Sequence, residues 1–128
     1  MQPRIEEEIQ LLRARYPLLE YHSEGNWVRI KDYKLPPGWN RSTVDVAFQI
    51  VPPPAAPYGI YAASGLLFNS QKPNNYSDPA NNVPFPGQWA VFSWAPGDGE
   101  WCPAQTAAAG SNYVMWVVGF RERFGEGL

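Results

Sequence analysis

The segment WAVFSWAPGDGEWCPA, residues 89–104, carries the two side chains of this sequence that are best suited to covalent chemistry. Cys102 is the only cysteine, and a thiol with an ordinary pKa of about 8.5 supplies some thiolate nucleophile at neutral pH. Ser93 stands between two aromatic residues, eight positions before Trp101. Its hydroxyl is far less acidic and needs a base or strong positioning to attack a carbonyl carbon. The chemistry could therefore belong to Cys102, to Ser93 or to neither.

Acid–base groups that could assist such a nucleophile are few. His22 is the only histidine, and it falls on or beside the first expected strand, where we interpret it as a strand-edge residue rather than a general base. Asp98 and Glu100 lie in a glycine-flanked turn, where carboxylates usually face solvent. Either carboxylate could instead orient an incoming amine or accept its proton.

Composition excludes several classes of function. One histidine and one cysteine cannot supply a zinc site, no carboxylate spacing is typical of a calcium loop, and no glycine-rich phosphate loop is present, so we expect no metal and no cofactor. A formal net charge of -2 without a Lys/Arg cluster gives no footprint for nucleic acid. A single cysteine forms no internal disulfide, no apolar run approaches the roughly 18 residues of a membrane span, and the acidic N-terminus is unlike a secretory signal. These features predict a single cytoplasmic domain over residues 1–128.

The elements that must position the segment are expected to be a helix, strands and a second helix. Apolar residues spaced four, three and four apart predict a helix over 3–16, ended by Pro17. Alternation over 43–50 predicts a strand with one buried face, and hence an antiparallel sheet covered on one side by the first helix. Further strands are expected at 18–22, at 27–33 and within 58–68, a long polar loop over 69–88, and a helix over about 106–124. The predicted class is α+β, with an N-terminal helix, a four-stranded antiparallel meander, an irregular segment and a C-terminal helix.

Three stretches resemble one known family. LPPGWNRSTVDVAFQI followed by VPPPAAPYG looks like the strand and proline-rich link of the ubiquitin-conjugating enzyme (UBC) fold, and more specifically of its bacterial branch, prokaryotic ubiquitin-conjugating family E. FSWAPGDGEWCPA resembles the active-site segment of these enzymes, in which a cysteine, seven residues and Trp-Ser-Pro follow one another. Here Ser93, seven residues and Trp101-Cys102-Pro103 stand in the same register.

The resemblance assigns different roles to the two candidates. Ser93 falls at the thioester-forming position, and Cys102 falls at the serine of Trp-Ser-Pro, so Trp101, Cys102 and Pro103 are expected to be structural. The implied function is that of an acyltransferase in a bacterial ubiquitin-like conjugation pathway, of the kind used in antiphage defence. An activating enzyme would transfer the C-terminus of a ubiquitin-like protein to Ser93 as an oxyester, which then passes to a target protein.

The sequence also departs from the family. Its His-Pro-Asn motif, whose asparagine supports the oxyanion, is missing, and Phe85 stands near its usual place. Asn81, Asn82 and Gln88 could replace that amide donor, although loop-capping is the plainer interpretation of all three.

Two other hypotheses remain open. A catalytically inactive adaptor of the same type would bind a ubiquitin-like protein without carrying it. An unrelated binding domain, for example for carbohydrate, is suggested only by six tryptophans and the Asn-rich loop. Trp89, Trp94 and Trp101 flank the segment, and we interpret them as structural anchors rather than partner contacts.

Overall fold

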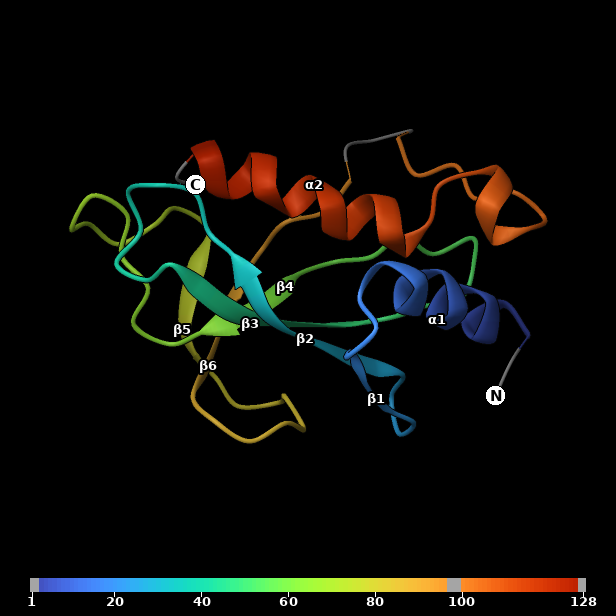
Figure 1. Cartoon of the computed structure of the whole chain (residues 1–128), viewed down its shortest axis with the longest axis horizontal. Helices are drawn as coiled ribbons and strands as arrows, with labels where there is room; N and C mark the ends of the chain where they lie inside the picture. Colours follow the sequence, from blue (N-terminus) through green and yellow to red (C-terminus); the bar gives the residue numbers. More distant parts are fainter. Residues whose placement is uncertain (1–2, 97–99, 127–128) are drawn as a thin grey trace.

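The computed structural model describes residues 3–96 and 100–126 and shows one sheet with two helices (Figure 1). The helices are α1 (Pro3–Arg15) and α2 (Tyr113–Glu126), and a short 3-10 helix, η1 (Ala107–Ala109), precedes α2. The strands are β1 (Glu20–His22), β2 (Trp27–Lys34), β3 (Thr43–Gln49), β4 (Ile60–Ala63), β5 (Tyr76–Ala80) and β6 (Trp89–Phe92). All pairings are antiparallel, and the strand order is β1-β2-β3-β4-β6-β5.

The predicted four-stranded meander, and with it the UBC-like fold class, is wrong. Over the described residues the sheet has six strands, and β6 inserts between β4 and β5, so the last three strands do not follow chain order. Both additional strands lie where the sequence indicated irregular chain: β5 within the expected polar loop, and β6 at the start of the expected irregular segment. Ser93 therefore directly follows a sheet strand.

The first helix forms for the reasons that its sequence indicates. Ile5, Ile9 and Leu12 are at most 4 % exposed and form one buried stripe. The helix ends at Arg15, two residues before Pro17, because a residue that precedes proline is driven out of the helical region.

The main core lies between the helices and one face of the sheet. It joins the α1 stripe and the α2 residues Val117, Phe120 and Phe124 to alternate side chains of the strands, among them Phe48 and Phe92. Both helices cover this face, whereas the sequence analysis expected the cover from the N-terminal helix. The second helix is also shorter than expected, because it begins at Tyr113 and η1 is a separate turn.

The other face of the sheet is partly covered as well. Trp27, Ala47, Trp89 and Phe85 form a second buried cluster there, the last contributed by the chain between β5 and β6. The prediction of a sheet covered on one side only is therefore wrong around these residues.

Candidate functional site

Ser93 is an exposed residue between two fully buried aromatic side chains. Phe92 is 0 % exposed and Trp94 is 2 % exposed, and their rings stack with centroids 4.3 Å apart. Since alternate residues of extended chain point to opposite faces, Ser93 lies on the face away from the helices. Two buried anchors thus fix the backbone that presents an exposed hydroxyl.

Residues that immediately precede β5 and β4 hold the same backbone from both sides. The Ser93 N–H donates to the Asn75 carbonyl at 2.9 Å, and the Gly59 N–H donates to the Trp94 carbonyl at 2.7 Å. Asn75 therefore extends the β5–β6 ladder opposite Ser93, and it has a positive φ of 58°. Gly59 also has a positive φ, 84°, which glycine adopts without strain.

Asn75 is the residue beside Ser93 that the sequence did not single out. It lies in the expected polar loop, and its proximity depends on β5, which residue pattern did not reveal. The only available signal was the number of asparagines in 69–82, which does not distinguish among them.

His22 cannot serve Ser93 as a base. It lies on β1, and β6, which leads to Ser93, is the fourth strand along from β1 in the sheet. Because neighbouring strands are about 4.8 Å apart, β1 and β6 are separated by roughly 19 Å. Its ring instead makes an edge contact with Phe85, at 6.2 Å between centroids. This agrees with the interpretation of His22 as a strand-edge residue.

The three amides expected near the oxyanion lie at the other end of β6. Gln88 precedes this strand and Ser93 follows it. Because a strand rises about 3.3 Å per residue, the two residues are roughly 16 Å apart. Asn81 and Asn82 follow β5 at the same far end, because Ala80 pairs with Trp89. Asn82 donates from Nδ2 to the Tyr61 hydroxyl at 3.0 Å. The structure does not bring these amides to Ser93.

Phe85, which stands near the place of the missing motif, is a packing residue. It is 9 % exposed in the second cluster, and the Arg29 guanidinium lies 5.1 Å from its ring centroid. Its carbonyl accepts the Trp89 indole N–H at 3.1 Å, so Trp89 is an anchor of this cluster.

Of the two carboxylate candidates, the structure describes only Glu100. Asp98 lies outside the described residues. Glu100 is exposed, and it lines a cavity together with Trp94, Trp101 and residues of α2; Ser93 is not among the described lining residues.

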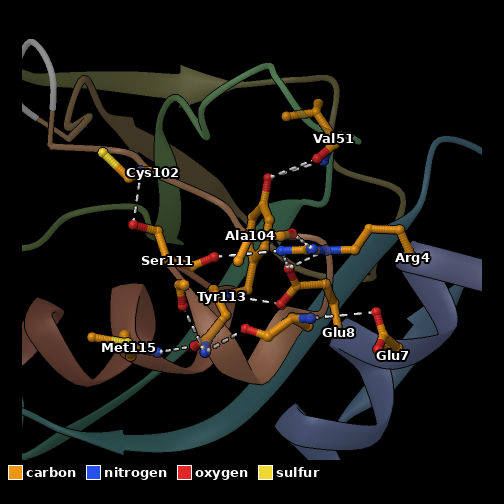
Figure 2. Close-up of polar contacts among 12 residues, drawn as sticks. Arg4, Glu7, Glu8, Val51, Cys102, Ala104, Ser111, Tyr113 and Met115 are labelled. Carbon is orange, nitrogen blue, oxygen red and sulfur yellow. Dashed lines mark hydrogen bonds and ion pairs between the residues drawn. The ribbon is translucent and has the colours of Figure 1, made fainter.

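Residues 101–103 form an arm that leads toward α2. Trp101 is half-buried and packs edge-on against Tyr113, with centroids 5.4 Å apart, and Pro103 is also half-buried. Ser111 holds Cys102 by its backbone: its hydroxyl accepts the Cys102 N–H at 2.9 Å, and its own N–H donates to the Cys102 carbonyl at 3.0 Å (Figure 2). The Cys102 side chain itself is exposed.

A buried ionic contact on α1 holds the end of this arm. Glu8 is 2 % exposed; its Oε1 accepts the Tyr113 N–H at 3.0 Å, and its Oε2 pairs with Arg4 at 3.2 Å. Arg4 in turn donates to the carbonyls of Ala104, at 2.6 Å, and Ser111, at 3.4 Å (Figure 2). Burial raises the pKa of Glu8 in spite of the Tyr113 N–H and Arg4, which lower it. Glu8 and Arg4 thus join α1 to the beginning of α2.

Membrane-spanning and metal-binding features are both absent from the described residues. Among residues 3–96 and 100–126, no helix combines the length and apolar character needed to cross a membrane. The same part of the chain contains no group of three or more His, Cys, Asp or Glu side chains placed to hold a metal ion.

Comparison with protein-family models, with curated proteins and with solved structures finds no match to this chain.

Proposed function

We propose that this protein is an acyl carrier in a bacterial ubiquitin-like conjugation pathway, with Ser93 as the residue that is acylated. The proposal rests on the resemblance in residue order around 89–103. The single observation that supports it best is the exposed Ser93, fixed between the buried Phe92 and Trp94. A positioned hydroxyl needs less help from a base than a mobile one, because its approach to the carbonyl is already oriented.

The reaction has two steps. In the first, Ser93 Oγ attacks the activated C-terminal carbonyl of a ubiquitin-like protein held by an adenylating enzyme. The new C–O bond forms as the bond to the activating group breaks, and the hydroxyl proton passes to water or to the leaving group. In the second, an amine or hydroxyl of the target attacks the same carbonyl carbon, and Ser93 leaves as its free hydroxyl.

The test is reconstitution with the adenylating enzyme, the ubiquitin-like protein and ATP, read by intact mass. We expect a one-to-one adduct that survives reducing agent but is cleaved by hydroxylamine, as an oxyester should be. Ser93→Ala should abolish it, whereas Ser77→Ala, at an exposed serine of β5, should leave it unchanged. Ser93→Cys should give a thioester that reducing agent cleaves. An adduct that persists in Ser93→Ala would contradict the assignment.

A second candidate function is an inactive adaptor that binds the ubiquitin-like protein without carrying it. The distance of His22 from Ser93 favours it, because it leaves Ser93 without the only histidine of the chain. The adaptor predicts carrier binding that is unaffected by Ser93→Ala, and no adduct even with Ser93→Cys.

A further inference from the structure

A cavity of about 450 Å³ lies between α2 and Trp94, Pro96, Glu100 and Trp101, and Ser93 is not among its described lining residues. This volume lies within the range of about 300–1,000 Å³ that is typical of small-molecule sites. Its larger apolar side chains are mostly aromatic and are Trp94, Pro96, Trp101, Met115, Trp116 and Phe120. The cavity is therefore separate from the candidate acyl site and has a wall chemistry of its own.

Charged side chains also line the cavity, and the described ones are two carboxylates and one guanidinium. Glu100 and Glu122 contribute carboxylates, and Arg123 contributes the one cation of this described lining. Arg123 donates to the Ala95 carbonyl at 3.0 Å, and its guanidinium carbon lies 5.9 Å from the Trp94 ring centroid. The wall thus already places one organic cation beside an aromatic ring, which is the arrangement of a cation–π contact.

Gly119 of α2 leaves part of this cavity open. An added Cβ would meet nothing within 4 Å, so packing does not require glycine there. Glycine inside a helix destabilises it relative to alanine. Gly119 is exposed and lines the cavity, so a larger side chain at this position would reduce the open space.

We propose that this cavity binds the alkylated ammonium group of a small organic cation, such as a quaternary amine. Aromatic walls favour a large, weakly hydrated organic cation, which loses little hydration on binding, over a strongly hydrated metal ion. The two carboxylates at the cavity oppose an anion and favour a cation. The proposal does not depend on acylation of Ser93.

Choline and its neutral isostere 3,3-dimethyl-1-butanol test the charge requirement, because the two have nearly the same shape. Titration of the full chain is followed by the indole N–H signals in NMR, assigned with single Trp→Phe variants. Choline should shift the signals of Trp94, Trp101 and Trp116 saturably and leave Trp27, in the second cluster, unchanged. The neutral isostere should bind about tenfold more weakly.

Matched variants test the location. Gly119→Leu should weaken choline binding at least about tenfold by filling the cavity. Gly125→Leu, at the other open glycine of α2, should not change it, because Gly125 does not line the cavity. Glu122→Gln should weaken binding about threefold, and Glu24→Gln, in the exposed turn after β1, should have no effect. If Gly119→Leu alters the Trp27 signal, Gly119→Ala replaces it as the smaller obstruction.

The outcomes separate the alternatives. Equal affinity for choline and its isostere would overturn the proposal in favour of a merely apolar cavity, as would the absence of any saturable shift. Binding that is unaffected by both Gly119 variants would also overturn it. An N-acetyl-trimethyllysine amide serves as a second cationic probe: tighter binding than choline would indicate that the cation is a protein side chain, and weaker binding would indicate a free molecule.

Discussion

The contact of Glu8 with the start of α2 should contribute to the stability of the folded protein. Glu8→Ala would leave the Tyr113 N–H without its acceptor and Arg4 without its ion-pair partner, both in a nearly buried position. Loss of an acceptor to a buried donor costs about 1–3 kcal/mol, and breaking a buried ion pair by removing one partner costs about 3–5 kcal/mol. Since Arg4 keeps its bonds to Ala104 and Ser111, we expect a loss of about 3 kcal/mol, or a fall in Tm of roughly 10 °C.

Glu8→Gln isolates the effect of charge, because the amide can still accept the Tyr113 N–H. The pKa of Glu8 is raised from 4.5 in the folded protein, with burial as the largest cause. A raised pKa means that the folded state holds the proton more tightly than the unfolded state. The protonated Glu8 therefore contributes to the free energy of unfolding. This contribution is fully present below pH 4.5 and is lost as the pH rises through the pKa of Glu8 in the folded protein. Wild type should therefore lose this contribution to stability as the pH rises above 4.5, and Glu8→Gln, which has no carboxylate to ionise at this position, should not show that loss.

Urea unfolding at a series of pH values from about 4 to 7 measures the difference. We expect the free energy of unfolding of wild type minus that of Glu8→Gln to fall as the pH rises. A difference that grows with pH would refute the reasoning, because it would mean that Arg4 and the Tyr113 N–H outweigh the cost of burying the carboxylate. Glu6→Gln, at an exposed position of the same helix, is the control and should show no such trend.

Two further substitutions test the packing around the sheet. Gly38→Ala should destabilise the protein by about 2 kcal/mol, measured by urea unfolding, because the added Cβ would lie 2.5 Å from Phe68 Cε1 and the residue has a φ of 106°. An effect below about 0.5 kcal/mol would contradict the close approach of the two residues. Tyr113→Phe should cost about 1–2 kcal/mol at neutral pH by removing the hydroxyl that accepts the Val51 N–H at 2.9 Å. Burial raises the pKa of Tyr113 from 10.0 to about 12, so wild type should also lose stability as the pH rises from 10 through 12, a loss that is absent in Tyr113→Phe.

The elements that the sequence predicted well are those whose own pattern carries the signal. The α1 stripe and the alternation over β3 each need only local spacing, and both are observed as buried faces. β5 was missed because YSDPA contains a proline and only one apolar side chain of any size; proline is tolerated there because β5 is the edge strand. β6 was missed because WAVF shows no alternation, since Trp89 is buried in one cluster and Phe92 in the other.

The surroundings of Ser93 depended on those two strands. Its backbone partner Asn75 precedes β5, so no spacing along the chain could identify it. Because β6 was not predicted, the sequence analysis expected three amides near Ser93 that the structure separates from it by the length of β6: Asn81, Asn82 and Gln88. Position along a strand, rather than sequence distance, decides which amide can reach the hydroxyl.

Trp94 connects the two proposed sites and permits a test of whether they communicate. It follows Ser93 directly, and its ring lines the cavity. The ring is 2 % exposed, stacks on Phe92 and meets Phe124 edge-on with centroids 5.1 Å apart, so cavity occupancy has little room to move it. Choline at saturation should therefore change the rate of adduct formation on Ser93→Cys less than about twofold, since coupling requires an element with two arrangements. A change of tenfold or more would contradict the rigidity of this contact and would mean that the cation is a regulator of acylation.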